Sequence, residues 1–227
     1  MTNKHFQYSV SIDCVIFGYD TTDLKVLLIK RGEEPYLNYW ALPGDLINPK
    51  ENIDQAVIRV LHDLTGLSEV FLNQVKTFGD VGRHPLGRVF TVAYYSLIKI
   101  SDYALHPSSF AVEAKWHSVK RLGELGFDHN KIFASCKEEL VKSVKIKPIG
   151  FELLPVEFTL TELQNLYETI LQETFDKRNF RKKINSMNLL IDCKKLQESV
   201  SHRPAKLYRF DKAKFAKLEK SGFSFEI

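Results

Sequence analysis

The amino-acid sequence predicts an α/β protein in which a mixed α/β sandwich is followed by a winged helix-turn-helix. Strand-like segments surround one amphipathic helix in the first part of the chain. Residues 145–155, with Pro148-Ile-Gly150 at their centre, interrupt this pattern as a linker does. After them the order becomes helix, turn, basic helix and hairpin. We therefore expect two domains, over residues 1–147 and 154–227.

Strands of the first domain are expected where the sequence alternates or runs apolar, at residues 7–17, 24–31, 70–78 and 88–100. A polar turn at 18–23 separates the first two strands. Residues 79–87 contain too much Gly and Pro for regular structure. Residues 128–144 are expected to form the last helix of this domain.

Residues 52–65 are expected to form an amphipathic helix between the second and third of these strands. Asn52 is a candidate N-cap, with Gln55 three positions later as in a capping box. Residues three and four apart share a helix face. Val60, Asp63 and Leu64 share one such face. Val60 and Leu64 also extend an apolar row that begins with Ile53 and Val57.

The second domain is expected to open with a helix capped by Thr159-Leu-Thr-Glu162. Its apolar side is Leu160, Leu163, Tyr167, Ile170 and Leu171. Asp176 can cap a second helix, whose core face is Phe180, Ile184 and Met187. Two β-like runs, 189–193 and 205–210, then form a hairpin around a loop at 201–204.

Composition indicates a soluble globular protein, with 44% hydrophobic and 26% charged residues. No run of about 18 apolar residues appears, and the N-terminus lacks a signal peptide's hydrophobic region. The cysteines Cys14, Cys136 and Cys193 show no metal-ligand spacing, which suits a reducing cytoplasm. We expect a cytoplasmic protein with no membrane partner.

The net charge of +4 is concentrated in the second domain. From Leu154 to the end there are 14 Lys and Arg against 10 Asp and Glu, whereas the first 153 residues contain 18 of each. Within residues 174–210 the balance is ten basic residues to three acidic. A neutral part joined to a basic patch indicates that the second domain binds a polyanion.

The stretch from Trp40 to Leu67 resembles the Nudix box. It reads Trp40-Ala-Leu-Pro-Gly-Asp45, then Glu51, then Arg59-Val-Leu-His-Asp-Leu-Thr-Gly-Leu67. Glu51 and Arg59 keep the seven-residue separation of that motif, and Gly66-Leu67 closes it. Asp45 replaces the glycine of the box, however, and Val60, Asp63 and Leu64 replace its three helical glutamates. The resemblance implies a Nudix fold.

The replaced glutamates matter because a Nudix enzyme holds Mg²⁺ or Mn²⁺ on that helix face, and these hard ions require several oxygen ligands. Val60 and Leu64 offer no oxygen. Asp63 and Glu51 are too few to hold a metal cluster. We therefore expect no catalytic residues, no metal and no cofactor, and a domain that binds a metabolite without turning it over.

Three segments of the second domain look like the C-terminal module of the Nudix-related transcriptional regulators, the NrtR-like family. They are residues 158–167, 176–184 and 203–210. With the degenerate first domain, the resemblance covers nearly the whole chain. It implies a cytoplasmic bacterial homodimer that represses operons for NAD metabolism or sugar use and is released from operator DNA by a metabolite.

The second helix is expected to enter a major groove of double-stranded DNA, where Arg grips guanine and Asn reads adenine. The hairpin is expected to contact phosphates from the side. The predicted DNA-binding residues are Lys177, Arg178, Asn179, Arg181, Lys182, Lys183, His202, Arg203, Lys206 and Arg209. Taken by itself, the basic run is more typical of a solvated helix face, and the capped helix before it and the hairpin after it favour DNA.

The first domain is expected to bind its effector where a Nudix substrate lies. The predicted effector-binding residues are Arg31, Trp40, Asp45, Glu51, Arg83, His84 and Arg88. The arginines can bind phosphate or hydroxyl groups. Trp40 also fits a packing role, and His84 a solvated loop.

The resemblance offers two effector classes, ADP-ribose-like nucleotides and sugars. Without a metal a diphosphate loses its main partner, and Asp45 adds a negative charge beside it. An acidic side chain can instead accept hydrogen bonds from sugar hydroxyls. We therefore expect a pentose such as arabinose, with an ADP-ribose-like nucleotide as the other candidate.

Two other function classes remain open at this point. One is a metal-dependent Nudix hydrolase of ADP-ribose-like compounds with a basic accessory domain. The other is an RNA- or protein-binding scaffold that does not contact DNA.

Overall fold

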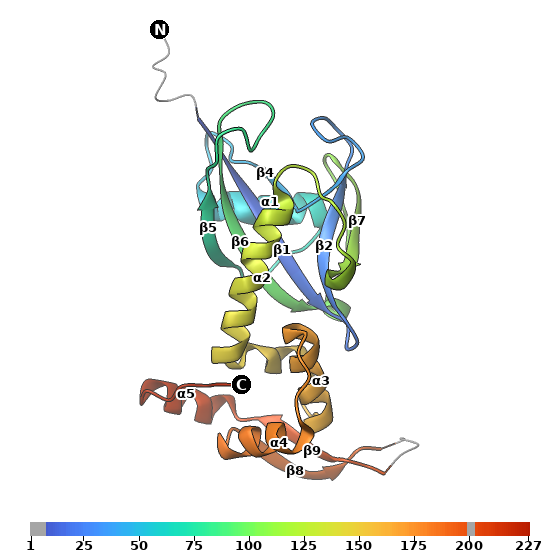
Figure 1. Cartoon of the computed structure of the whole chain (residues 1–227), viewed down its shortest axis with the longest axis vertical. Coiled ribbons are helices and arrows are strands. Elements are labelled where there is room, and N and C mark those ends of the chain that lie inside the picture. Colours follow the sequence, from blue (N-terminus) through green and yellow to red (C-terminus); the bar gives the residue numbers. More distant parts are fainter. Residues whose placement is uncertain (1–7, 199–202) are drawn as a thin grey trace. The chain divides into compact units, whose positions relative to one another are not determined.

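A computed structural model describes residues 8–198 and 203–227 of the chain, which divide into two compact units (Figure 1). The first unit consists of the described residues up to Asp20 and of Leu24–Leu140. The second consists of Thr21–Asp23 and Val141–Ile227. The division thus falls inside a helix, at residues 140 and 141, earlier than the expected boundary.

The first unit is built on a seven-stranded mixed sheet. Its strands are β1 (Ser9–Tyr19), β2 (Leu24–Arg31), β3 (Trp40–Ala41), β4 (Gly44–Leu46), β5 (Asn73–Phe78), β6 (Val89–Lys99) and β7 (Ala111–Ser118). The main path runs β3-β2-β1-β6-β5, and β1 and β6 are parallel along their full length. The four expected strands are confirmed, and no regular element lies in residues 79–87. β3, β4 and β7 were not predicted from the sequence.

One edge of β1 pairs with two different strands. Near its start β1 pairs with β4, with Asp13 opposite Gly44, and near its end it pairs with β2, with Phe17 opposite Val26. Between these two ladders the backbone of Cys14 bonds to Pro43. β4 and β2 therefore lie along different stretches of the same edge of β1.

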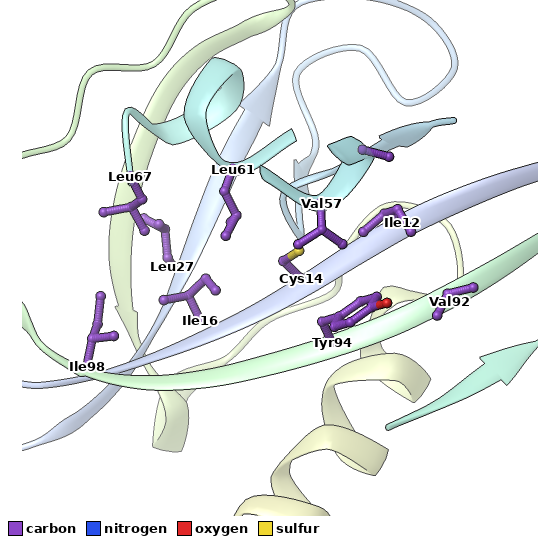
Figure 2. Packing of buried hydrophobic residues seen from close by; sticks show 11 residues of the cluster. Ile12, Cys14, Ile16, Leu27, Val57, Leu61, Leu67, Val92, Tyr94 and Ile98 are labelled. Carbon is purple, nitrogen blue, oxygen red and sulfur yellow. The ribbon is translucent and has the colours of Figure 1, made fainter. Parts of the chain in front are cut away.

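Two helices cover the two faces of this sheet (Figure 1): α1 (Ile53–Thr65) and α2 (His129–Ile146). Alternate residues of β1 face them in turn. Cys14 lies in the apolar cluster with Val57 and Leu61 of α1 (Figure 2), whereas the ring of Phe17 lies 5.8 Å from that of Phe133 of α2. Short 3₁₀ turns at Ile100–Asp102 and Val119–Arg121 complete the unit.

Helix α1 begins as its sequence predicts. The side chain of Asn52 accepts a hydrogen bond from the Gln55 backbone, and the Gln55 side chain accepts one from the backbone of Asn52. The helix ends at Gly66, whose φ of 79° is the left-handed conformation that glycine adopts without strain. Since both ends are fixed by local chemistry, its position in the sequence is predictable.

The second unit contains a 3₁₀ helix η4 (Pro148–Leu153), helices α3 (Leu160–Leu171), α4 (Lys177–Ser186) and α5 (Lys212–Lys220), and a hairpin of β8 (Leu190–Leu196) and β9 (Lys206–Phe210). Thr159 and Glu162 form the expected capping box, and the Asp176 side chain accepts from the Asn179 backbone. The predicted helix, turn, helix and hairpin are confirmed. Helix α5 was not predicted.

The predicted linker is in fact part of this unit. Phe151 is buried in η4, and its ring stacks on that of Phe210 of β9 at 4.3 Å. Sequence reasoning weighted Pro148 and Gly150 and overlooked the aromatic and aliphatic side chains between them and Leu153. Met187, expected in the core, is only half-buried, whereas Phe180 and Ile184 of α4 are buried.

In the part of the chain that the structure describes, no helix is both long and apolar enough to span a membrane.

Candidate functional site

Arg59 anchors the turn that precedes α1. Its guanidinium donates to Glu51 Oε2 at 2.9 Å and Oε1 at 2.6 Å, to Asp45 Oδ2 at 2.9 Å and to the Leu46 carbonyl at 2.8 Å. Hydrogen bonds from Arg59 lower the pKa of Glu51 to about 2. One arginine therefore pairs with both carboxylates of this region and offsets part of their negative charge.

Two of the three helical positions that carry glutamates in a Nudix box are part of the core. Val60 and Leu64 are 0% and 1% exposed, and they pack in an apolar cluster with Ile29, Ala41 and Ala111. Asp63 lies outside this cluster, 3.2 Å from the His62 ring. Among residues 8–198 and 203–227, no three His, Cys, Asp or Glu side chains are grouped as metal ligands. The donors present do not fit the divalent cations that the Nudix fold implies.

A cavity of about 200 Å³ lies in the first unit. Ser11 and Asp13 of β1, Gly44 of β4 and Thr91 of β6 form its inner part. Other lining residues are Arg31, Glu33, Glu34, Pro35, Asp45, Leu46, Arg83, His84, Leu86, Val89, Phe110, Phe127 and His129. Gly44 has no room for a side chain, since a Cβ there would meet Asp13 Oδ1 at 1.8 Å.

Buried charges form the floor of this cavity. Arg83 donates from Nε and Nη2 to the two oxygens of Asp128, at 2.9 and 2.6 Å, and from Nη1 to Thr91 Oγ1. Asp13 lies beside this pair, with Oδ2 3.9 Å from Arg83 Nη2. Because all three guanidinium nitrogens of Arg83 already have partners, its first role is to hold the floor together.

His129 completes the floor as a neutral ring. Its Nδ1 accepts a hydrogen bond from the Leu42 backbone at 2.9 Å, which places the proton on Nε2, 3.6 Å from Asp13 Oδ1. Burial lowers the pKa of His129 to about 3 and raises the pKa of Asp13 to about 7, although Arg83 opposes the second effect. Near neutral pH, Asp13 is therefore populated in both its protonated and its ionised form.

Arg31 is the cation best placed to meet a ligand. It is 7% exposed, and its guanidinium carbon lies 4.9 Å from the centre of the Phe110 ring and 5.2 Å from that of Phe127. Nε donates to the Pro35 carbonyl at 2.7 Å, while Nη2 stands 3.7 Å from Glu33. The guanidinium is thus oriented at the cavity wall with donor capacity remaining.

Of the predicted effector-binding residues, Arg31, Asp45, Arg83 and His84 line the cavity, and Trp40, Glu51 and Arg88 do not. Trp40 packs edge-on against His117 of β7, with ring centres 4.4 Å apart. The guanidinium of Arg88 stacks on Phe90, and Glu51 binds Arg59. These three side chains have structural partners that the sequence alone does not reveal.

Sequence reasoning missed several lining residues, Asp13, Phe110, Phe127 and His129, and also Asp128, which binds the lining residue Arg83. Asp13 did carry a signal, because an acidic residue inside the apolar run of β1 must have a buried partner. The Phe127-Asp-His129 triplet before α2 carried none that separates it from an ordinary loop.

Helix α4 presents its positive charge outward. Phe180 and Ile184 are buried, whereas Lys177, Arg178, Asn179, Lys182 and Lys183 are exposed. Among the described residues, no carboxylate pairs with the four cations of this exposed set. Lysines elsewhere in the unit do have partners, as Lys195 with Glu157 at 2.8 Å and Lys212 with Glu152 at 3.1 Å. The helix therefore carries a concentrated charge that the chain itself does not neutralise.

The remaining predicted DNA-binding residues lie around this helix. Arg181 is half-buried and donates to Thr161 Oγ1 of α3 at 3.2 Å. Lys206 and Arg209 are exposed on β9, and Lys206 Nζ is 3.4 Å from Asp192. Arg203 is exposed at the start of the returning strand segment. His202 lies outside the described residues.

Comparison with known families gives one match for each part of the chain. Residues 7–136 match the NUDIX domain. Residues 150–210 match the NrtR DNA-binding winged helix domain.

Three similar proteins span both parts or the first alone. The "ADPR responsive transcriptional repressor NtrR" of Acinetobacter baylyi is 31% identical over 205 residues, 88% of this chain and 81% of that protein. The crystal structure of Shewanella oneidensis NrtR complexed with a 27mer DNA has a TM-score of 0.71 at 28% identity and covers 95% of this chain and 97% of that one. The NUDIX domain of the Shewanella protein complexed with ADP ribose has a TM-score of 0.57 at 29% identity and covers 62% and 94%.

Proposed function

This chain belongs to the NrtR-like family of Nudix-related transcriptional regulators, and on that premise we propose that it is an ADP-ribose-responsive repressor. The second unit binds double-stranded operator DNA. The first unit binds the nucleotide in its cavity without hydrolysing it, and binding releases the repressor from the operator.

One observation carries the proposal: the cations of α4 have no carboxylate partners among the described residues and stand on a helix framed by α3 and the hairpin. A polyanion supplies the missing counter-charge. Since residues 150–210 match a DNA-binding winged helix, duplex DNA is favoured over RNA or an acidic protein.

ADP-ribose suits the cavity of the first unit. Arg31 offers donor groups to the diphosphate, and Phe110 and Phe127 beside it offer apolar surface to a base or a ribose. Two points argued against a diphosphate, the missing metal and the charge of Asp45. Arg31 supplies a cation that can take the place of the metal, and Arg59 pairs with Asp45 and offsets part of its charge. The cavity of about 200 Å³ is smaller than most ligand sites, so the nucleotide fills it with one end and extends from its mouth.

The expectation of a pentose such as arabinose finds no support among the relatives, two of which are described with ADP-ribose. ADP-ribose nevertheless contains two ribose groups, and Glu33 and Glu34 at the cavity wall can accept hydrogen bonds from their hydroxyls. The acidic side chains that suggested a sugar thus suit the sugar portion of the nucleotide.

Absence of hydrolysis is proposed from the donor set. Val60 and Leu64 contribute aliphatic carbon where metal ligands are required, and Glu51 is held by Arg59. Without bound divalent cations the diphosphate is neither polarised nor given an activated water.

A homodimer is proposed because one short helix reads few base pairs, and two copies on a palindrome multiply affinity and specificity. ADP-ribose must then favour a dimer geometry that no longer matches the spacing of the two half-sites.

The test uses the full chain and a library of random duplexes, from which bound sequences are selected and amplified. We expect a palindromic consensus. Fluorescence anisotropy of a consensus duplex should then fall when ADP-ribose is added and stay constant with arabinose. Release by arabinose alone would restore the pentose hypothesis, and a chain that selects no duplex is not a repressor.

The catalytic proposal is tested by incubating the chain with ADP-ribose and Mn²⁺ and measuring AMP and ribose 5-phosphate. Intact nucleotide is expected, and robust turnover would favour a hydrolase with a basic accessory domain. Arg31→Gln should abolish the ADP-ribose response, whereas Lys30→Gln, at the adjacent residue of β2 that does not line the cavity, should not.

A further inference from the structure

A polar hollow of about 590 Å³ lies beside α4 in the second unit. Thr161 at the start of α3, Lys177 and Arg181 of α4, and Arg203 before β9 contribute to its wall. Segments that are distant in sequence thus place three cations around one space.

The charge inside this hollow is positive. Its one carboxylate, Glu162, is engaged in the capping box, where its Oε2 accepts from the Thr159 backbone at 2.7 Å and from Thr159 Oγ1 at 2.9 Å. Against that single negative charge stand Lys177 and Arg181, so an anion gains from entering, and Arg203 also lines the hollow.

Arg181 has unused donor capacity directed to this region. Its Nη2 donates to Thr161 Oγ1 at 3.2 Å, which fixes the side chain against α3. Its Nε is buried and has no hydrogen-bond partner within the described part of the chain. A buried donor without a partner costs on the order of 1–3 kcal/mol, so a small turn of the side chain that brings this group to a ligand oxygen is favourable.

Helix geometry divides the basic residues of α4 into two stripes. Residues four apart lie one above the other, so Lys177 and Arg181 form a stripe next to the core residue Phe180. Arg178 and Lys182 form a second stripe, turned about 100° further from the core. Only the first stripe lines the hollow.

We infer that the hollow is a phosphate clamp for the DNA backbone, with Arg181, Lys177 and Arg203 as its ligands, while Arg178 and Lys182 face the bases. This inference rests on the proposed binding of DNA and adds a division of labour within one helix. Backbone contacts fix the register of a protein on a duplex but carry no sequence information. Substitutions in the first stripe must therefore weaken binding to every duplex, whereas substitutions in the second must reduce sequence preference.

The experiment measures affinity of the full chain for the selected consensus duplex and for an unrelated duplex of the same length, across a salt series. Lys177→Ala and Arg181→Ala should each make the slope of log K against log salt shallower by about 0.9. Both should weaken the two duplexes by the same factor. Arg178→Ala should lower the ratio of the two affinities by roughly 5- to 150-fold.

Control variants show whether an effect comes from the lost charge, from a damaged fold or from the loss of any lysine in this unit. Arg181→Lys keeps the charge, so it should keep the salt slope even though it changes the contact with Thr161. Lys212→Ala removes one charge from a lysine already paired with Glu152, and it should change neither quantity. Circular dichroism of each variant reports whether α3 and α4 are intact.

An unchanged salt slope in Lys177→Ala and Arg181→Ala overturns the clamp, as does a loss confined to the consensus duplex. Either result leaves DNA binding itself standing. An unmodified chain that binds neither duplex removes the proposed function and the clamp together.

Discussion

Helices α1 and α4 are built alike and used differently. Each begins with a side-chain cap, Asn52 or Asp176, and each buries one apolar stripe. In α1 two of the three positions at which a Nudix enzyme places its helical glutamates, Val60 and Leu64, belong to the buried stripe, whereas in α4 the charged residues all lie off it. In α1, then, the aliphatic residues at these two positions stabilise the packing of the helix, whereas in α4 the charges off the apolar stripe are exposed to a partner.

Placing carboxylates at positions 60 and 64 of α1 should cause the largest loss of stability. In the double variant Val60→Glu, Leu64→Glu, two ionisable groups enter an apolar cluster without partners, at roughly 3–5 kcal/mol each. Trp40 and Trp116, the two tryptophans of the chain, both lie in the first unit, so urea unfolding followed by their fluorescence reports this loss.

Asp63→Glu is the matched control, because Asp63 is half-exposed and the change should stay within about 0.5 kcal/mol. A double variant as stable as the unmodified chain would show that positions 60 and 64 are not core positions.

Asp13→Asn should change how stability depends on pH. Folded Asp13, with a pKa of about 7, keeps its proton between pH 4 and 7, whereas the unfolded residue, near 3.8, loses it. The folded state therefore binds one more proton, and stability falls by about 1.4 kcal/mol per pH unit as pH rises through this window. His129, whose pKa is lowered to about 3, has the opposite slope up to about pH 6.5.

The two slopes offset each other in the unmodified chain, and the asparagine variant reveals that of His129 alone. Tryptophan-monitored unfolding at several pH values should show the variant gaining stability from pH 4.5 to 6.5, relative to a flatter parent. Parallel curves for parent and variant would place the pKa of Asp13 near that of an exposed carboxyl.

Reversing a charge on α4 should change DNA binding and leave the stability of the first unit as it is. Lys182→Glu should weaken operator binding by about tenfold or more, because a cation is lost and a like charge meets the phosphates. Tryptophan-monitored stability of the first unit should not change. Ile58→Glu on the exposed side of α1, at a residue 67% exposed, is the matched substitution and should leave DNA affinity unaltered.

Removal of the caps gives the smallest expected effects. Asn52→Ala and Asp176→Ala should each cost about 1 kcal/mol of helix stability. The first should lower the urea midpoint seen by tryptophan, and the second should appear only in circular dichroism and in DNA affinity. Equal effects of both variants on tryptophan fluorescence would contradict the division into two units.

What the sequence predicts well is local. The caps at Asn52, Thr159 and Asp176 and the apolar periodicity of the helices fix α1, α3 and α4, because each signal lies within a few residues of the element it defines. The winged helix follows from the order of these elements.

What the sequence hides depends on distant partners. β7 has a weak alternation and exists as a strand because β2 pairs with it, and Trp40 packs against that unforeseen strand. The cavity joins Asp13, Arg83 and His129, which lie far apart in the sequence. Four of the seven predicted effector-binding residues, Arg83 among them, line the cavity, whereas Asp13 and His129 were not predicted.

Gly44 has an evolutionary consequence. A Cβ at position 44 would meet Asp13 Oδ1 at 1.8 Å and the Ile12 carbonyl oxygen at 2.8 Å, so position 44 cannot gain a side chain while the acid at 13 stays in place, whereas position 13 can change with Gly44 kept. We expect descendants that acquire a methyl group at 44 to have shortened or lost the acid at 13 first, and with it the proton that this acid exchanges near neutrality. Ancestral reconstructions of the lineage should show the two substitutions in that order.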